Sequence, residues 1–240
     1  YWADSLIQTN DGGYAIASRT AEGDFQLIKT DSDGNLQWVK TYGLTRPNIP
    51  FALVQTSDGG YAIAGDTDEN PYAYAWLVKT DSSGNMQWNK VYTEVGRARA
   101  WSLVQTDDGG YAIAGAKWYY DGWMMKTDAS GTMQWSRSFV EANNTQLVSI
   151  FKTKDGGYIA AGATQFPPFT GKSEAYVVKT DSSGNMEWNK TFSGSAGHDY
   201  GNGAIQTSEG GYAIACHTDN TGNGDAWLIK ADVAGNLEWD

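Results

Sequence analysis

The sequence consists of internal repeats, and this feature restricts the fold of the chain more than any other. The stretch VKTDSSGNMQWNK at residues 78–90 returns as VKTDSSGNMEWNK at residues 178–190, with one letter changed. Looser copies stand at residues 28–40, 125–137 and 229–240, and a phrase of the type QTSDGGYAIAG precedes every copy. Five copies thus account for nearly all of the 240 residues. Such self-similarity indicates one supersecondary unit that is stacked several times.

Each repeat reads as four short strands. In the second and third copies they lie at residues 75–80, 85–92, 102–106 and 111–115, and they are rich in β-branched and aromatic residues. The DGG and DSSGN junctions suit hairpin turns, because Asp bonds to its own backbone and Gly adopts positive φ. A period of about 40–50 residues with four strands is typical of a β-propeller blade. The sequence therefore predicts an all-β, five-bladed β-propeller of four-stranded antiparallel blades, with an open β-solenoid as the alternative.

We expect one domain over residues 1–240, with repeats at approximately 1–42, 43–92, 93–139, 140–192 and 193–240. The formal net charge is −11 and no basic cluster is present, which argues against nucleic acid as a partner. No apolar run is long enough to span a bilayer, so no membrane insertion is expected. The single Cys216 excludes an intrachain disulfide and leaves the redox compartment open.

Residues that occur once per repeat are interpreted as architecture. They include a lysine of strand three, the aspartate that opens the following turn, and a tryptophan expected to pack blade on blade. The DSSGN loops carry too few carboxylates for calcium, so no metal site is predicted. A further acidic column begins strand three, and we interpret it as capping strand ends, because glycosidases need two acids roughly 5–10 Å apart. Its members are Asp24, Asp121, Glu174 and Asp225, with Tyr74 in the second repeat.

Function is expected where the repeats differ. The two repeated turns of each blade should emerge on one side, and the connections of variable length on the other, where binding usually resides. Aromatic rings beside polar groups suit the stacking of sugars, and Tyr, Trp and Arg also dominate protein interfaces. Some of these rings could instead pack beneath their loops. The predicted ligand-binding residues are Tyr72, Tyr74, Arg97, Arg99, Trp101, Trp118, Tyr119, Tyr120, Asp199 and Tyr200.

The inventory for catalysis is small. The chain has two histidines, no serine or cysteine in a nucleophile motif, and no phosphate-binding loop. We therefore predict no catalytic residues and no cofactor. If the protein were a glycoside hydrolase, Asp4 and Asp199 would be the nearest candidates, because both come just before innermost strands.

The phrase AWLIKADVAGNLEW at residues 226–239 is similar to the repeat of the PQQ-like, quinoprotein-dehydrogenase-like β-propellers. Together with DYGNGAIQTSEGGYAIA at residues 199–215, it resembles repeat arrays in secreted or surface proteins of bacteria and archaea. This resemblance implies an exported, cell-surface propeller, without PQQ because that cofactor's ligands are missing. Glycosylation sequons at Asn143 and Asn189 also point to export.

These observations predict a non-enzymatic, extracellular or cell-surface binding module that recognises a glycan or a surface protein. Two alternatives remain open at this point. One is a glycoside hydrolase on a five-bladed propeller, and the other is a structural repeat unit of a surface-layer or adhesin array, in contact with neighbouring copies or with domains of a larger protein.

Overall fold

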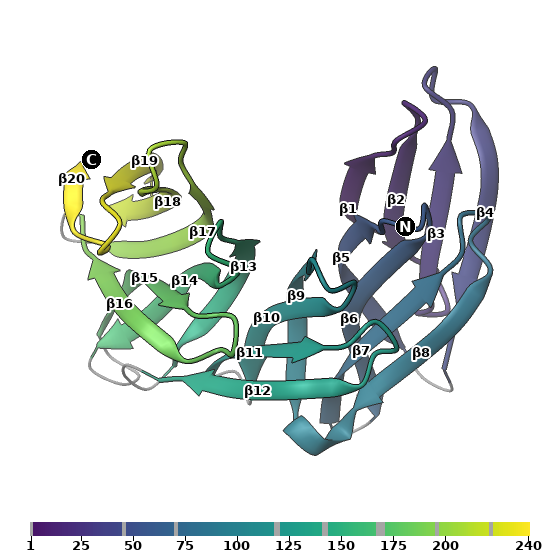
Figure 1. Ribbon diagram of the computed structural model, residues 1–240, viewed down its shortest axis with the longest axis horizontal. Coiled ribbons are helices and arrows are strands. Elements are labelled where there is room, and N and C mark those ends of the chain that lie inside the picture. Colours follow the sequence, from purple (N-terminus) through teal and green to yellow (C-terminus); the bar gives the residue numbers. More distant parts are fainter. Residues whose placement is uncertain are drawn as a thin grey trace. The chain divides into compact units, whose positions relative to one another are not determined.

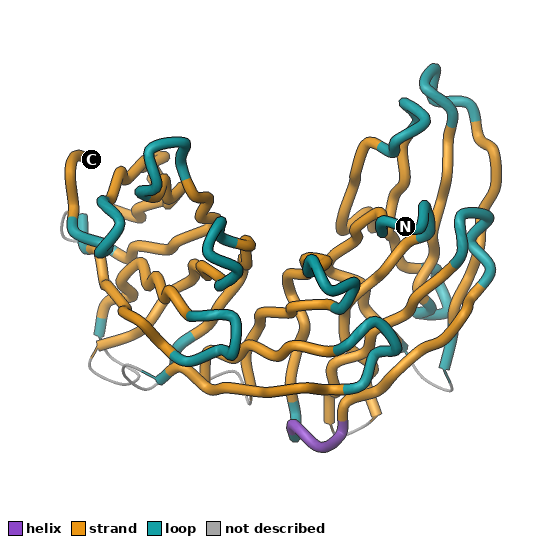
Figure 2. Tube along the Cα trace, viewed as in Figure 1, coloured by secondary structure: helices purple, strands orange, loops and turns teal. Residues whose placement is uncertain are grey.

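A computed structural model of the protein describes residues 2–44, 47–69, 72–117, 121–140, 144–166, 171–194, 197–220 and 223–240. In these residues the strands form five antiparallel sheets of four (Figure 1). Each sheet takes its strands in chain order, so consecutive strands are hydrogen-bonded neighbours. Apart from one 3-10 turn at Thr93–Val95, the described elements are strands joined by loops (Figure 2). The prediction of an all-β chain with four-stranded antiparallel blades is confirmed.

The bounds of the strands follow the repeats. The first sheet holds β1 (Trp2–Gln8), β2 (Tyr14–Arg19), β3 (Phe25–Thr30) and β4 (Leu36–Tyr42). The second holds β5 (Asn48–Gln55), β6 (Tyr61–Glu69), β7 (Tyr72–Thr80) and β8 (Met86–Tyr92). The third holds β9 (Ala98–Gln105), β10 (Tyr111–Lys117), β11 (Asp121–Thr127) and β12 (Met133–Phe139). The fourth holds β13 (Gln146–Lys152), β14 (Tyr158–Phe166), β15 (Lys172–Thr180) and β16 (Met186–Phe192). The fifth holds β17 (His198–Gln206), β18 (Tyr212–Asn220), β19 (Asn223–Ala231) and β20 (Leu237–Trp239).

The chain divides into two compact units. One comprises residues 1–111 and 128–132, and the other comprises residues 112–127 and 133–240. The first two sheets belong to the first unit and the last two to the second, while the boundary runs through the third sheet. That the whole chain is one domain stays a prediction. Among the described residues, no helix has the length and apolarity needed to cross a bilayer.

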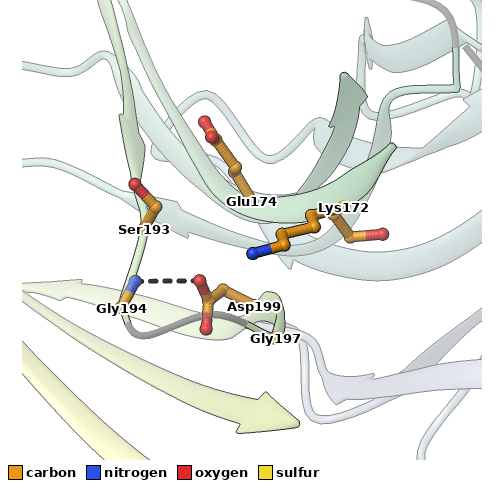
Figure 3. A pocket seen from close by; sticks show the side chains of 7 residues that line it. Lys172, Glu174, Ser193, Gly194, Gly197 and Asp199 are labelled. Carbon is orange, nitrogen blue, oxygen red and sulfur yellow. Dashed lines mark hydrogen bonds between the residues drawn. The ribbon is translucent and has the colours of Figure 1, made fainter. Parts of the chain in front are cut away.

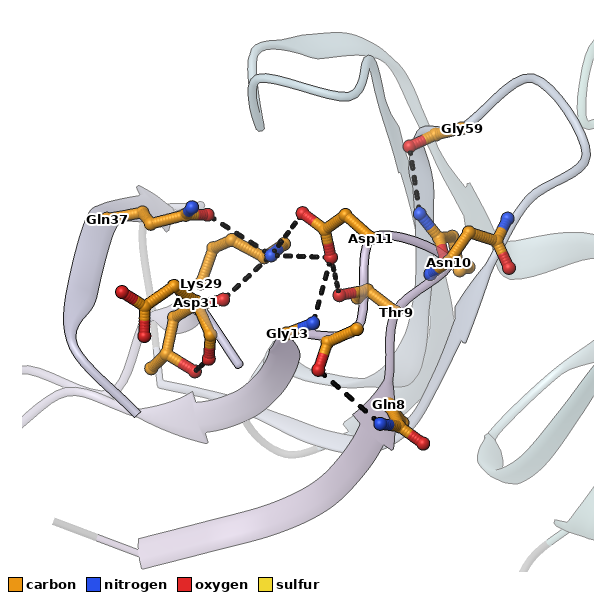
Figure 4. A network of polar contacts seen from close by, with 12 residues as sticks. Gln8, Thr9, Asn10, Asp11, Gly13, Lys29, Asp31, Gln37 and Gly59 are labelled. Atoms are coloured by element: carbon orange, nitrogen blue, oxygen red, sulfur yellow. Dashed lines mark hydrogen bonds and ion pairs between the residues drawn. The ribbon is translucent and has the colours of Figure 1, made fainter. Parts of the chain in front are cut away.

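The lysine that recurs on strand three ties two hairpins of its own sheet together. Lys29 is buried, and its ammonium donates to Asp11 at 2.8 Å and to Gln37 at 3.1 Å (Figure 4). Asp11 also accepts from the N–H of Gly13 at 3.0 Å, which fixes the DGG turn. Asp31 instead accepts two N–H bonds inside its own turn. The repeated lysine and the repeated aspartate therefore both stabilise the turns and strands of their sheet, as the sequence predicts.

The recurring tryptophan joins consecutive sheets within each unit, as predicted. The ring of Trp38 on β4 meets that of Tyr61 on β6 edge to face, with centroids 5.9 Å apart. It also lies over Gly84, in the turn before β8. Aromatic pairs in this geometry add to the free energy gained by burial. The same ring pair recurs as Trp88 with Tyr111, Trp135 with Tyr158 and Trp188 with Tyr212.

Each sheet is an antiparallel meander, so its two repeated turns lie at one end and its variable connections at the other. The strands reach further toward the variable end than predicted. In the second sheet β6 and β7 stay in register to Glu69 and Tyr72, so Tyr72 and Tyr74 lie in a strand rather than in a loop.

The innermost strands also begin earlier than predicted, which places Asp199 and Tyr200 in β17. A β-bulge between Gly201 and Gly203 explains the difference, because an extra residue interrupts the alternation by which a strand is recognised. Comparable register shifts occur in β1, β5 and β13.

Candidate functional site

A pocket of about 410 Å³ opens at the variable end of the fourth and fifth sheets, inside the second unit. Three elements build it: the start of β15, the connection that follows β16, and the start of β17. Figure 3 shows Lys172 and Glu174 on one strand and Asp199 across the pocket from them. The lining residues are Lys172, Ser173, Glu174, Ser193, Gly194, Gly197 and Asp199.

Asp199 is the most constrained side chain of this pocket. Its residue is 1% exposed, and Oδ2 accepts the backbone N–H of Gly194 at 2.8 Å. Oδ1 is buried and has no hydrogen-bond partner among the described residues, and the same holds for Oγ1 of Thr218. Asp199 and Thr218 are register partners across β17 and β18. Buried polar atoms are nearly always hydrogen-bonded, so a carboxylate oxygen left over beside a pocket indicates a functional group.

Glycine at position 194 makes room for this carboxylate. A Cβ at that position would stand 3.3 Å from Oδ1 of Asp199 and 3.7 Å from Oγ1 of Thr218. The first distance is tighter than ordinary van der Waals contact. Both unpartnered oxygens therefore lie close to the position that a side chain at residue 194 would occupy.

Glu174 and Lys172 supply the other charges. Glu174 is half-buried on β15, and Lys172 is exposed at the first position of the same strand. Successive residues of a strand point to opposite faces, so residues 172 and 174 share one face. The interpretation of Glu174 as a strand-end cap missed that β15 packs beside β17 of the next sheet, which puts Glu174 and Asp199 in one pocket.

An aromatic stack lies on β17 and β18, next to the strand that carries Asp199. The ring of Tyr200 lies nearly parallel to that of His217, with centroids 4.7 Å apart, and to that of His198 at 6.3 Å. Nδ1 of His198 accepts the N–H of Ser173 at 3.0 Å, which ties the stack to the pocket wall. Because Asp199 and Tyr200 are adjacent in a strand, they face opposite sides of the fifth sheet. The histidines thus flank a tyrosine rather than the carboxylates.

Cys216 is buried on the same sheet. Burial, together with the nearby carboxylate of Asp199, raises the pKa of its thiol to about 12. A thiol is a poor nucleophile while it stays protonated. Cys216 is therefore a small residue buried in the fifth sheet.

Several other predicted binding residues lie in the first unit. Tyr74 is half-buried on β7, Arg97 precedes β9, and Trp101 is half-buried on β9. Nε of Arg99 lies 3.1 Å from Oδ2 of the buried Asp66, so this arginine forms a contact between consecutive sheets.

The remaining predictions are only partly placed. Tyr72 lies on β7, but its side chain is outside the described part of the structure, and Trp118, Tyr119 and Tyr120 are outside it altogether. Asp4 is exposed on β1, in the first unit. Of the predicted residues, Asp199 lines the pocket, and Tyr200 follows it in β17 on the opposite face of the sheet. Within the described ranges, no three His, Cys, Asp or Glu side chains are grouped so that they could hold a metal ion.

No family model and no curated protein matches the chain. Solved structures do match, over nearly its whole length. An endo-arabinase from Bacteroides thetaiotaomicron is 14% identical, with a TM-score of 0.56 over 98% of this chain and 95% of its own. A protein of Bifidobacterium bifidum assigned as an exo-β-1,3-galactanase is 13% identical, with a TM-score of 0.54 over 98% and 90%. The BP39L lectin of Burkholderia pseudomallei is 8% identical, with a TM-score of 0.51 over 98% and 82%.

At these identities the likeness shows the fold, which is that of a five-bladed β-propeller. It corrects one prediction. The sequence led us to expect that the protein is not an enzyme, and the glycoside-cleaving enzymes among the similar structures contradict this. The prediction relied on the small number of histidines and nucleophile motifs. It was wrong to do so, because two carboxylates are enough for glycoside hydrolysis and acidic residues are common in this chain. The similar structures are propellers, but membership of the PQQ-like family stays a prediction.

Proposed function

We propose that the protein is a glycoside hydrolase whose carboxylate pair is Glu174 and Asp199. The observation that carries the proposal is the buried, unpartnered Oδ1 of Asp199 in a pocket that a second carboxylate also lines. Glycoside hydrolases commonly use two acidic side chains that flank the scissile bond, with one as general acid and the other as base or nucleophile. The pocket supplies two such groups.

The surroundings of the two carboxylates suggest their roles. Asp199 is held by the N–H of Gly194 and keeps one oxygen for a water molecule or for the anomeric carbon. Glu174 is half-buried and lies across the pocket, where it can protonate the departing oxygen (Figure 3). The ammonium of Lys172 carries three N–H donors, which suit sugar hydroxyls. The chain thus offers an acid, a base or nucleophile, and a hydroxyl-binding group in one place.

The comparisons support this choice and guide the choice of substrates. An endo-arabinase and a protein assigned as an exo-β-1,3-galactanase share the fold. Arabinan and β-1,3-galactan are therefore the first substrates to test. Release of reducing ends from a panel of plant and bacterial glycans measures the activity directly.

The decisive variants are Glu174→Gln and Asp199→Asn, which keep shape and remove charge. Each should lower kcat by about 10²–10⁴-fold, the usual effect of losing a catalytic acid or base. Asp225→Asn is the matched control, because Asp225 occupies the strand-three position of Glu174 in the fifth sheet and is exposed. Absence of turnover on every glycan, or full activity of both variants, would refute the proposal.

A glycan-binding surface is a second proposal, favoured by the group of stacked rings formed by His198, Tyr200 and His217. Flat rings stack on the apolar face of sugars, and a lectin is among the similar structures. Glycan-array binding that is lost in Tyr200→Ala but kept in Asp199→Asn would support it, and equal binding by both variants would contradict it.

We also propose an extracellular or cell-surface location, inferred from the sequons and the repeat resemblance. Fractionation of the source cells tests it. A surface-protein partner stays a prediction.

A further inference from the structure

One hydrogen bond joins the residues that directly precede the two candidate carboxylates. The backbone N–H of Ser173 donates to Nδ1 of His198 at 3.0 Å. Glu174 is the next residue after the donor, and Asp199 is the next residue after the acceptor. Ser173 lies on β15 and His198 begins β17, so the bond crosses from the fourth sheet to the fifth, inside the second unit. A single contact therefore links the backbones that carry the two carboxylates.

The start of β15 extends beyond its neighbour β16. That strand ends at Phe192, which pairs with Ala175, so in the described register residues 172–174 have no strand partner on the β16 side. Ser173 is 8% exposed, and a buried backbone N–H needs an acceptor from the protein. The imidazole of His198 supplies this acceptor where the sheet does not.

The junction between the first and second sheets makes the corresponding contact without a side chain. Gly23 and Asn48 occupy the positions there that Ser173 and Asp199 occupy at the pocket. The backbone N–H of Asn48 donates to the carbonyl of Gly23. Both junctions therefore connect the start of strand three to the start of the next innermost strand, and at the pocket a histidine ring makes the connection.

We propose that His198 is a positioning residue, which holds Glu174 and Asp199 at the separation that glycoside cleavage requires. The inference rests on the hydrolase proposal and deepens it, because it names the group that fixes the spacing of the acid and the base. This spacing decides the reaction, since the two carboxyl groups stand about 5 Å apart in retaining enzymes and about 6.5–9.5 Å apart in inverting ones. A shift of β15 against β17 by part of this difference would weaken catalysis strongly.

The acceptor nitrogen, rather than the ring as a whole, performs this role. A neutral imidazole accepts through one nitrogen and donates through the other, so His198 carries its proton on Nε2. In asparagine Oδ1 is bonded to Cγ, as Nδ1 is in histidine, so His198→Asn keeps an acceptor near the same place. His198→Leu has no acceptor. Because asparagine lacks a ring, it restores the hydrogen bond but not the stacking with Tyr200.

Steady-state kinetics on arabinan and β-1,3-galactan, together with hydrogen exchange of the Ser173 amide, test the proposal on the whole protein. His198→Leu should lower kcat by about 10- to 100-fold with little change in KM, because it displaces reacting groups and removes none. His198→Asn should recover most of kcat. The Ser173 amide should exchange several-fold faster in the leucine variant than in wild type or in the asparagine variant.

Gln206→Leu is the matched control. Oε1 of Gln206 accepts the backbone N–H of Lys154 at 2.8 Å, which is the same kind of contact between the same two sheets, at the opposite end of β17. Its loss should lower stability and leave kcat like that of wild type. Ser173→Pro removes the donor N–H and serves as the second variant if His198→Leu does not fold. Circular dichroism checks the fold of each protein.

The results separate the positioning role from the hydrolase proposal. If wild type is active, full kcat in His198→Leu, equal losses in the leucine and asparagine variants, or unchanged exchange of Ser173 would each overturn the positioning role alone. An equal loss of kcat in Gln206→Leu would also overturn it, because any contact between the two sheets would then have the same effect. A wild type without turnover on any glycan refutes the hydrolase proposal and the positioning role together.

Discussion

The backbone N–H of Gly194 donates a hydrogen bond of 2.8 Å to Oδ2 of Asp199, and the missing side chain of this glycine leaves space beside Oδ1. One residue of a variable connection therefore both holds the buried carboxylate through Oδ2 and leaves Oδ1 uncrowded by a side chain. The reactive geometry of Asp199 depends on position 194 through sterics and through one hydrogen bond.

Gly194→Ala should accordingly lower kcat on the glycan substrate by roughly tenfold, because displacing a reacting group by a fraction of an ångström weakens catalysis strongly. The free energy of unfolding should change by less than about 0.5 kcal/mol, because the residue is exposed. Steady-state kinetics and thermal unfolding measure the two effects. Gly224→Ala is the control, since a Cβ there meets only the Thr218 carbonyl, at 3.9 Å. Equal kinetics of the two variants would contradict the role given to Gly194.

Among the lysines of strand three, a fully buried one should contribute more to stability than a less buried one. Lys179 is 1% exposed and donates to Asp155, Glu187 and the carbonyl of Thr180 at 2.8–2.9 Å. Lys179→Met keeps the buried stem but leaves these acceptors without their donor, so the free energy of unfolding should fall by about 1–3 kcal/mol. Denaturant titration measures it.

The matched variant is Lys230→Met. Lys230 is less buried, and its ammonium pairs with Glu238 at 2.8 Å and approaches the carbonyl of Ala231 at 3.5 Å. Its loss should cost under about 1 kcal/mol, as is usual for exposed pairs. A larger loss for Lys230→Met than for Lys179→Met would show that burial does not decide the contribution of this lysine.

The aspartates of the DGG turns make the fold sensitive to acid. Partial burial raises the pKa of Asp58 and of Asp155, but hydrogen bonds from a lysine, a threonine and a glycine N–H outweigh it and lower both pKa values to about 2. A folded pKa below the unfolded value, about 3.9, means stability that is complete above that value and is lost as pH falls toward about 2. Unfolding midpoints should therefore drop between about pH 4 and pH 2.

The variant Asp155→Asn tests this origin. It removes one of the titrating carboxylates, so the stability of the variant should depend less steeply on pH in the same interval than that of wild type. Urea titrations at several pH values measure the slope. An unchanged slope would assign the acid sensitivity to other groups.

The repeats made the fold and its internal contacts predictable, because one contact must serve every blade. The lysine on strand three and the tryptophan on strand four were assigned to architecture for this reason, and Lys29 and Trp38 confirm it. The partner of Lys29 was less predictable. Asp11 lies eighteen residues before it and Asp31 two residues after it, and only the pairing of β2 with β3 brings Asp11 to the ammonium.

The pocket was harder to predict for a related reason. Asp199 was named from its place before an innermost strand, but Glu174 belongs to the preceding repeat. The two meet because β15 packs beside β17, and a β-bulge sets which residues of β17 reach the variable end. Contacts between repeats that occur only once leave no periodic trace in a sequence. Lys172 and Gly194 carried no signal beyond their place in variable connections.

The last prediction compares two side chains of β16. Trp188 packs on Gly235 and meets Tyr212 with centroids 5.4 Å apart, whereas Met186 is 53% exposed. Trp188→Ala should lower the free energy of unfolding by about 2–4 kcal/mol, because it removes a large ring from between two sheets and leaves a cavity. Met186→Ala should change it by less than about 0.5 kcal/mol, as is usual for exposed side chains. Chemical unfolding of both variants makes the comparison. Equal losses would mean that the tryptophan of strand four does not hold consecutive sheets together.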